Sequence, residues 1–294
     1  MDANQLRAEV RDFLVTRRGR ITPTEAGLPI YGGLRRVPGL RREELAMLAG
    51  LSAEYLARLE RGNLRGVSES VLEALSRALR LSEAERAHLY DLARAANAGP
   101  GGRRAAVPQQ VRPGVQRILD SMTAPALVSN ARMDYLAANA LGRALYAPLF
   151  DSPVGVNAAR FLLLDPRGAD FYPEWDAAVD DVVALLRAQT ARTPFDKVLT
   201  DLVGELSTRS EVFRARWARH DVRQHLTGTK RLRHPVVGEL DLRFETMQLP
   251  ADPGLALLLY TAEPASPTAD ALNLLASWAA TSGSLPSATP ADRA

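Results

Sequence analysis

Two short amphipathic segments separated by a glycine dominate the hydrophobic pattern of the N-terminal third of the chain. Residues 42–49 and 53–61 each carry apolar side chains at helical spacing, so each segment predicts a short helix. Gly50 supplies the left-handed backbone that a tight turn between helices requires, and the Ser52 hydroxyl can cap the second helix. The pattern therefore predicts a helical hairpin. Its expected buried positions are Leu45, Leu48, Leu56 and Leu59, with Ala46 where the two helices cross.

Two further helices are predicted after the hairpin. Ser68 precedes the segment VLEALSRALR and is placed to cap it. Ser82 precedes EAERAHLYDLARAA, and Glu85 three residues later completes a capping box. Both helices have enough apolar surface to close a small all-α bundle over the hairpin. The apolar stripe of the first comprises Val71, Leu72, Leu75 and Leu79.

The C-terminal two thirds alternate between helical and strand patterns. Residues 97–114 are rich in Gly and Pro without an apolar stripe and predict a linker, and residues 281–294 predict a disordered tail. Between these segments we expect antiparallel strands around a helical insert, which indicates an α+β domain. Helices are predicted at 115–122, 174–191, 195–206, 210–219 and 268–279, and strands at 126–130, 133–137, 231–234, 240–249 and 255–261. The predicted domains are therefore 1–96 and 115–280.

The outward face of the second hairpin helix carries side chains suited to reading DNA bases. A recognition helix presents its first residues to base edges in the major groove. Arg58 can form a bidentate pair with guanine, Glu54 can accept from cytosine N4, and Ala53 can contact a thymine methyl group. The alternative at this stage is an ordinary helical hairpin with solvated arginines.

Phosphate contacts are expected around the same hairpin. Seven arginines (17, 18, 20, 35, 36, 41 and 42) and a single acid, Glu25, lie between residues 17 and 42. Such a basic run beside a helical hairpin is typical of a DNA phosphate footprint, and the alternative is a solvated loop. The residues predicted to hold phosphates are Arg42, Ser52, Tyr55, Arg61 and Asn63.

Composition argues against an enzyme and against a generic polyanion binder. The formal net charge of the 294-residue chain is only +3, so its basic character is local. The chain has no cysteine, and its four histidines lack metal-ligand spacing, so we expect no metal site, no cofactor and no catalytic residues. The N-terminus is charged and polar, and the longest apolar stretch, 255–262, is shorter than the ~20 residues that span a bilayer. A cytoplasmic protein without membrane contact is expected.

The chain also resembles a known family over residues 30 to 275. VPGLRREELAMLAGLSAEYLARLERG and SESVLEALSRALRLSEAERAHLYDLARAA are similar to the Cro/C1-type (XRE) helix-turn-helix of MmyB-like transcriptional regulators. RPGVQRILDSM, YLAANALGRALY, NAARFLLLDP, WDAAVDDVVALLRAQ, LVGELSTRSEVFRARWARHDVR and GTKRLRHPVVGELDLRFETMQLP resemble the C-terminal domain of that family. The resemblance implies a one-component regulator of double-stranded operator DNA with a PAS-like domain for an apolar, fatty-acid-like ligand.

The resemblance also bears on individual hairpin residues. Ala53, Glu54 and Arg58 fall on the usual base-reading positions of the family, and Arg42 takes the place of a phosphate-contacting Gln. Ala53 departs from the polar residue that is common there, so hydrogen-bonded readout at that position is in doubt.

Aromatic residues of the second domain are candidates for lining a ligand pocket, because apolar ligands bind in such surroundings. His220 and His234 are candidates for orienting a polar head group; the alternatives are a helix C-cap and a strand-end hydrogen bond. The aromatic candidates can equally be plain core. The predicted pocket residues are Phe161, Trp175, Phe213, Trp217, His220, His234 and Phe244.

Together, these patterns and the family resemblance predict a ligand-responsive homodimeric transcription factor that binds two DNA half-sites about one helical turn, or a multiple, apart. A second hypothesis keeps the DNA-binding bundle but makes the C-terminal domain a dimerisation or protein-interaction module without a small ligand.

Overall fold

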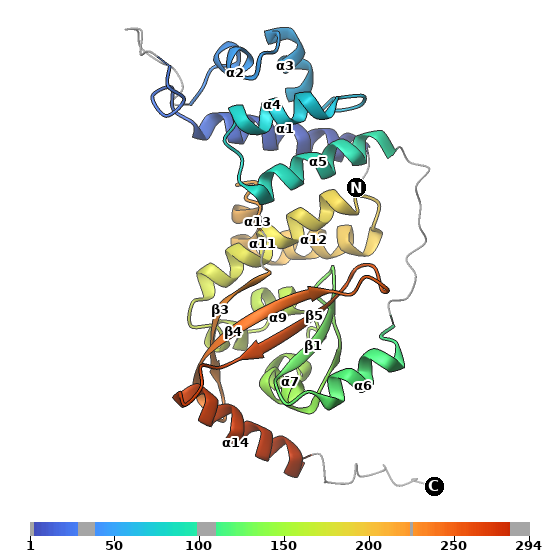
Figure 1. Cartoon of the computed structure of the whole chain (residues 1–294), viewed down its shortest axis with the longest axis vertical. Coiled ribbons are helices and arrows are strands. Elements are labelled where there is room, and N and C mark those ends of the chain that lie inside the picture. Colours follow the sequence, from blue (N-terminus) through green and yellow to red (C-terminus); the bar gives the residue numbers. More distant parts are fainter. Residues whose placement is uncertain (1–2, 29–38, 99–109, 224–225, 283–294) are drawn as a thin grey trace. The chain divides into compact units, whose positions relative to one another are not determined.

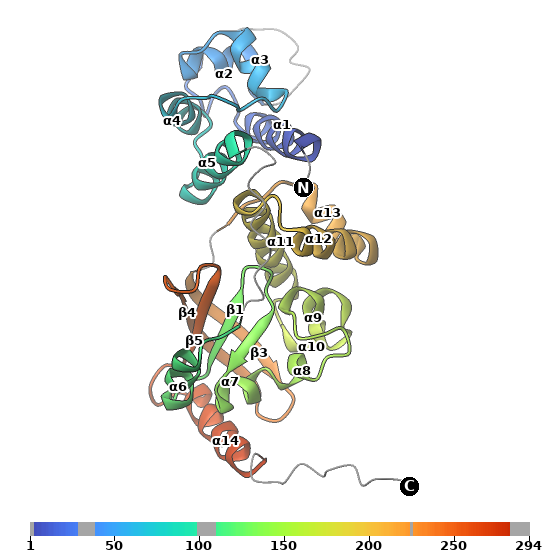
Figure 2. The same ribbon diagram turned by 90° about the vertical axis from the view of Figure 1, so that its right-hand side faces the viewer.

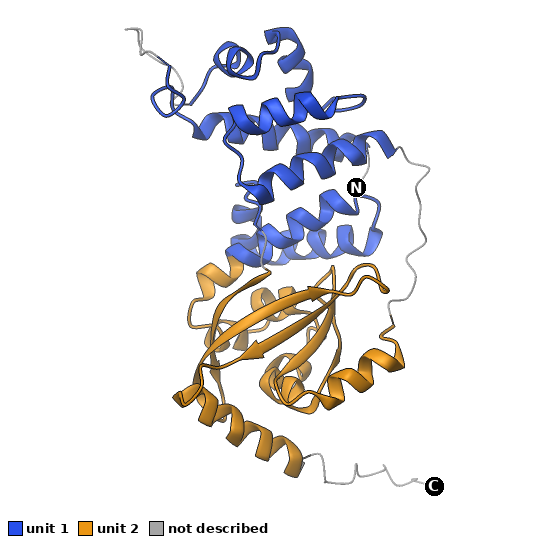
Figure 3. Ribbon diagram, in the orientation of Figure 1, with its two compact units in different colours: residues 1–107, 180–224 blue, residues 108–179, 225–294 orange. Residues whose placement is uncertain are grey.

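The computed structural model describes residues 3–28, 39–98, 110–223 and 226–282. These residues form two compact units that do not follow chain order (Figure 3). Unit 1 comprises residues 1–107 and 180–224, and unit 2 comprises residues 108–179 and 225–294. The segment 180–224 therefore groups with the N-terminal bundle. The predicted domains, 1–96 and 115–280, are each continuous in the sequence, and their boundaries stay a prediction.

Within its described residues, the regular elements of unit 1 are all helices, joined by turns and loops (Figure 1). Helix α11 begins in unit 2 and continues from Asp180 into unit 1. The helices of the unit are α1 (Ala3–Arg20), α2 (Arg42–Ala49), α3 (Ala53–Glu60), α4 (Glu69–Ala78), α5 (Glu83–Ala98), α11 (Trp175–Arg192), α12 (Lys197–Arg209) and α13 (Glu211–Trp217).

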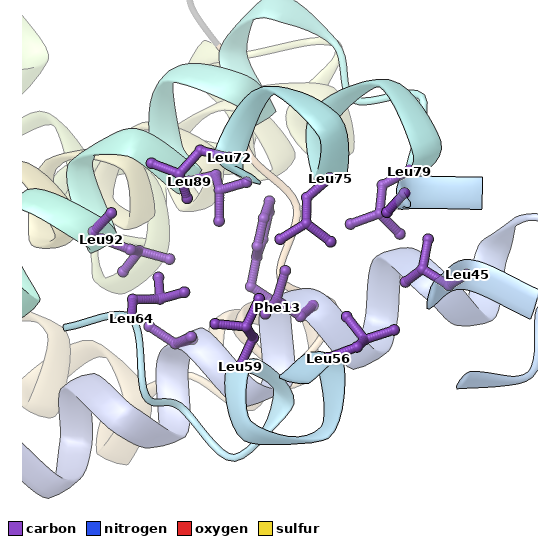
Figure 4. Packing of buried hydrophobic residues seen from close by; sticks show 14 of the residues in the cluster. Phe13, Leu45, Leu56, Leu59, Leu64, Leu72, Leu75, Leu79, Leu89 and Leu92 are labelled. Atoms are coloured by element: carbon purple, nitrogen blue, oxygen red, sulfur yellow. The ribbon is translucent and has the colours of Figure 1, made fainter. Parts of the chain in front are cut away.

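The core of unit 1 is a leucine cluster around Phe13 of α1 (Figure 4). Leucines from α2, α3, α4 and α5 converge on this ring, and Ala191 of α11 and Val222 join the same cluster. Helix α1 was not predicted from the pattern, although its buried residues Leu6, Val10 and Phe13 share one helical face. The predicted burial of Leu48 is wrong: it is 37% exposed, because the buried side of the short α2 is formed by Leu45, Ala46 and Ala49.

Unit 2 is an α+β domain built on a five-stranded antiparallel sheet of order β2-β1-β5-β4-β3, as expected for a PAS-like fold. Its strands are β1 (Ala126–Asn130), β2 (Tyr135–Ala138), β3 (Thr227–His234), β4 (Gly238–Gln248) and β5 (Leu255–Thr261). Its helices are α6 (Pro113–Ser121), α7 (Ala140–Leu145), α8 (Ala147–Phe150), α9 (Ala158–Leu164), α10 (Arg167–Phe171), α14 (Pro267–Ser282) and the first turn of α11.

The two faces of the sheet are covered by different helices (Figure 2). Helix α6 packs Val115 and Leu119 against Val128 and Leu257 on one face. Side chains alternate along a strand, so Tyr260 and its β4 partner Phe244 lie on the opposite face, which meets the aromatic residues of the α7–α10 region.

Three strands have boundaries that differ from the predictions. One of them is β4, which runs from Gly238 to Gln248 rather than from residue 240 to 249. β3 begins at Thr227 rather than at residue 231, because its first residues are polar and pair with β4 through the backbone without an apolar pattern. β2 begins at Tyr135 rather than at residue 133, because Met133 has a positive φ of 65° and belongs to the turn.

Candidate DNA interface and ligand-domain residues

The hairpin of α2 and α3 has the turn and cap that the sequence predicts. Gly50 adopts the left-handed conformation with φ 65° and ψ 33°, and its N–H donates to the carbonyl oxygens at the end of α2. The Ser52 hydroxyl accepts a hydrogen bond from the Tyr55 N–H at 3.1 Å. Ala46 is buried on α2, which packs against α3. A side chain at position 50 would be strained, so the turn depends on glycine.

The three predicted base-reading residues lie on the exposed side of α3. Ala53 and Glu54 form its first turn, and Arg58 follows Glu54 by four residues, so the two charged side chains share one helix face. The Arg58 guanidinium lies 5.6 Å from the ring centroid of Tyr55, and its Nη2 donates to the Arg65 carbonyl oxygen at 3.4 Å. These contacts orient Arg58 without burying it.

Glu60 is a buried carboxylate that organises the arginines beside the hairpin. It accepts from Arg18 Nε at 2.6 Å through one oxygen and from Arg42 Nε at 2.7 Å through the other. Arg42 is nevertheless about half exposed, so part of its guanidinium still faces outward. Sequence reasoning missed Glu60, although its position four residues after Leu56 on the buried side of α3 was a usable signal.

The other predicted phosphate residues surround the ends of α3. Ser52, Arg61 and Asn63 are exposed, and Tyr55 is half-buried against the core of unit 1.

Only part of the arginine run can serve as a phosphate footprint. Assigning Arg17 to the footprint is wrong: its side chain is 3% exposed and forms an ion pair with Glu85 at 2.7 Å, because α1 packs on α5. Arg20 pairs with Asp221 at 2.6 Å. Arg35 and Arg36 lie outside the described residues.

The predicted pocket residues fall into both units rather than one. Phe213, Trp217 and His220 lie in unit 1, on or directly after α13. Phe213 stacks on Trp217 with ring centroids 5.3 Å apart, and the Arg187 guanidinium lies 4.2 Å from the Trp217 ring centroid. Phe161, Trp175, His234 and Phe244 lie in unit 2.

His220 belongs to a buried ionic cluster within unit 1. Arg187 of α11 is 0% exposed and donates to the Glu9 carboxylate of α1 and to the Trp217 carbonyl oxygen. His220 Nδ1 lies 3.5 Å from Glu9, and His88 Nε2 of α5 lies 3.7 Å from it. Burial acts to raise the pKa of Glu9, but the nearby His220, His88 and Arg187 outweigh it and hold that pKa well below its usual range. This Glu9 cluster ties α1 and α5 to residues 180–224.

Acidification is expected to destabilise unit 1. Burial lowers the pKa of His88 below its usual 6.5, so the unfolded chain takes up a proton at pH values where the folded protein does not. The contribution of His88 is full above about pH 6.5 and falls as the pH decreases, by at most about 1.4 kcal/mol per pH unit. Glu9, whose pKa is also lowered, adds to the loss only below its usual 4.5. Urea unfolding followed by circular dichroism between pH 7.5 and 5 measures this slope. His88→Gln should flatten it, and an equally steep slope in that variant would contradict the assignment.

In unit 2, each of the four predicted pocket residues has a packing or hydrogen-bonding role. Phe161 is buried with its ring centroid 5.6 Å from that of Phe171, and Phe244 is buried against the Tyr260 ring. The Trp175 indole N–H donates to the Leu162 carbonyl oxygen at 3.0 Å. The two His234 nitrogens lie 3.0 Å from the Ala144 carbonyl oxygen and 3.2 Å from the Val236 N–H, as in the strand-end alternative.

Four buried tyrosines of unit 2 were missed by sequence reasoning. Tyr135 of β2, Tyr146 between α7 and α8, Tyr172 after α10 and Tyr260 of β5 come from four separate elements. We call them the tyrosine cluster. The Tyr146 and Tyr260 hydroxyl oxygens lie 2.7 Å apart. Burial raises the pKa of all four phenols, that of Tyr135 to about 12, so the hydroxyls stay protonated at neutral pH.

Within the described residues, the structure contains no group of three or more His, Asp or Glu side chains able to hold a metal ion. The same residues include no helix with the length and apolar character needed to cross a membrane.

Two family models match the chain. The model described as "MmyB-like transcription regulator ligand binding domain" matches residues 111–275, which is more than half of the chain. A helix-turn-helix domain model matches residues 17–89. These families are regulatory and ligand-binding rather than enzymatic. No curated protein matches the chain.

Proposed function

The chain belongs to the MmyB-like transcription regulators, and from this premise we propose that α3 reads operator DNA while unit 2 binds an apolar, fatty-acid-like ligand. DNA binding through the helix-turn-helix and a ligand-binding type of domain follow from the family. The reading residues, the ligand class and the oligomeric state are proposals. The observation that carries the DNA-reading proposal is the exposed face of Ala53, Glu54 and Arg58 on a capped helix that follows a glycine turn.

The base contacts are assigned by side-chain chemistry. Arg58 offers two parallel N–H donors to guanine O6 and N7, and Glu54 offers an acceptor to cytosine N4. Ala53 offers only a methyl contact. The stacking of Arg58 near Tyr55 supports this role, because a preoriented guanidinium loses less conformational freedom on binding.

Arg42, Ser52, Tyr55, Arg61 and Asn63 are proposed to hold phosphates on either side of α3. Arg42 is positioned by its bond to Glu60 and retains outward-facing donors. Tyr55 would use its hydroxyl, because its backbone N–H is taken by Ser52. Such contacts fix the register of the helix on the duplex and make binding depend on salt.

We further propose a homodimer that binds two half-sites about one helical turn, or a multiple, apart, because single helix-turn-helix units read few base pairs. Comparing the mass of the protein in solution with the symmetry of its selected DNA site tests this proposal.

The fatty-acid-like ligand is proposed to bind in unit 2. Buried aromatic side chains, Phe161 and Phe244 among them, support an apolar site on the face of the sheet opposite α6. The competing hypothesis makes unit 2 a dimerisation or protein-interaction module. Native mass spectrometry of the purified protein separates them: a retained lipid-sized mass favours a ligand, whereas its absence together with DNA binding that fatty acid leaves unchanged favours the interaction module.

Selection of bound DNA from a random pool tests the DNA-reading proposal. Arg58→Ala should cost ~1–3 kcal/mol on the preferred site and relax the preference at one base pair, because one bidentate contact is lost. Arg42→Ala is the matched comparison: it should weaken all sequences about equally and lower the salt slope by ~1. An unchanged preference in the Arg58 variant, or an altered one in the Arg42 variant, would contradict the assignment of these contacts.

A further inference from the structure

Helix α14 of unit 2 has an apolar flank that the unit does not cover. The helix packs against α7 and β4 on its buried side. Leu274 and Trp278, four residues apart, share another face, where their side chains are 66% and 44% exposed. After Leu275 none of residues 276–281 is buried, although the helix continues through them. Helices gain most of their stability from tertiary packing, so a partner on this flank is expected.

A cavity of about 250 Å³ lies along the other side of α14. The helix contributes Ala269, Asn273 and Ala276 to its wall, and Leu141 of α7 and Tyr260 of β5 line it as well. The three α14 residues recur at helical spacing and form a face that differs from the face of the exposed tryptophan. The helix therefore has a protruding side chain on one flank and a hollow on the other.

The charge distribution favours a second copy of this chain as the partner. None of the described residues that line the cavity carries a charge at neutral pH. Helix α14 contains a single charged residue, Asp270, in its first turn. A charged peptide or a nucleic acid would require complementary charges on this surface. A surface that meets its own copy brings like groups together, so it has to be poor in charge, as this one is.

The two flanks of α14 are also complementary to each other. A dimer with twofold symmetry uses the same patch on both copies. If the twofold axis runs along the helices, the flank that carries Trp278 in one copy faces the flank that lines the cavity in the other. Each copy then provides one indole and one cavity. Tryptophan side chains inserted into a partner's pocket are frequent anchors of protein interfaces.

We infer that α14 forms the contact between two copies of this chain, with Trp278 of each copy inserted into the cavity beside α14 of the other. The inference rests on the proposed homodimer and names the surface that holds it together. The ligand-binding family model ends at residue 275, so Trp278 lies beyond the matched segment.

Sedimentation velocity of the whole chain over a range of concentrations tests the contact. Trp278→Ser removes the indole, and Asn273→Arg places a charged side chain at the cavity. Each change should weaken dimerisation at least tenfold, because both contacts of a symmetric pair are lost. Ile118→Ser is the matched control, since Ile118 is also an exposed apolar residue on a helix of unit 2, and it should dimerise like the wild type. Leu274→Ser replaces Trp278→Ser if that variant does not fold.

An equimolar mixture of the two variants tests the insertion itself. The Trp278→Ser copy keeps its cavity, and the Asn273→Arg copy keeps its indole. A mixed pair therefore has one of the two contacts intact, whereas a pair of either variant has none. The mixture should dimerise more tightly than either variant alone. Absence of such recovery would contradict the insertion of Trp278 into the cavity.

The outcomes separate this inference from the proposed function. Wild-type dimerisation in both variants would overturn the α14 contact while the homodimer stands. A wild-type chain that is monomeric at every concentration would overturn the homodimer and, with it, a second copy as the partner of α14. Binding to a single half-site of the selected DNA should be unchanged in Trp278→Ser, because α3 is not altered. A loss there would place the effect of the substitution in DNA binding and overturn the assignment.

Discussion

Replacing Arg187 by methionine is expected to destabilise unit 1 by about 3–5 kcal/mol, because it leaves the Glu9 carboxylate buried without its guanidinium partner. Methionine keeps most of the length of the side chain, so the loss reports the charge and its hydrogen bonds, including the one to the Trp217 carbonyl oxygen, rather than a cavity. The two other groups near Glu9 do not replace the guanidinium. The pKa of His88 is lowered by burial, and His220 Nδ1 lies 3.5 Å from the carboxylate.

Urea unfolding at neutral pH measures this loss, and two further variants make the result specific. Arg209→Met removes an exposed arginine whose partner Glu205 is one helical turn away, and should cost less than about 0.5 kcal/mol. Glu9→Gln combined with Arg187→Met should be less destabilised than the sum of the single changes, because no unpaired charge stays buried. A loss below about 1 kcal/mol in the Arg187 variant would contradict a structural role for the pair.

Arg187 joins a segment matched by the ligand-binding model to the N-terminal helices. Arg187 lies within the stretch matched by the ligand-binding model, whereas Glu9 and His88 belong to the N-terminal helices. The stability of the unit that carries α3 therefore depends on residues 180–224. DNA binding should fall in the Arg187 variant in proportion to the fraction of unfolded protein, although no DNA contact is removed.

The hairpin could be predicted because its signals are local. Gly50 and Ser52 act through the backbone of their own turn, and the leucines of α3 are spaced by the helix itself. The α+β class of unit 2 was predictable for the same reason, since the apolar alternation in β4 and the continuous apolar run in β5 mark strands directly. Local chemistry of this kind does not depend on what packs against the element from far along the chain.

The partners of charged residues could not be predicted in this way. Arg17, Arg42 and Arg187 look alike in the sequence, yet Arg17 and Arg187 are buried against carboxylates on other helices and Arg42 is about half exposed. Which arginines face DNA depends on where Glu60, Glu85 and Glu9 lie, and that is decided by packing. The tyrosine cluster is a similar case, because four single residues on four elements form no pattern along the chain.

Helix α1 is part of the hydrophobic core of unit 1 and not only a segment rich in arginine. Its arginines mask an apolar face, and Phe13 at 0% exposure lies at the centre of the leucine cluster beneath α2 and α3 (Figure 4). The helix-turn-helix model begins at residue 17, so most of α1 lies before the matched segment. Helix α1 nevertheless packs against α3 and shares its hydrophobic core.

Phe13→Ala is therefore expected to destabilise unit 1 by about 3–5 kcal/mol, the usual loss when a fully buried phenylalanine leaves a cavity. Val15→Ala on the same helix is the control: its side chain is 40% exposed, so the change should cost less than about 1 kcal/mol. Urea unfolding followed by circular dichroism compares the two variants, and DNA binding should weaken in Phe13→Ala alone. Equal stabilities would mean that α1 is dispensable for the bundle, and α3 would then have to be supported by α2, α4 and α5 without it.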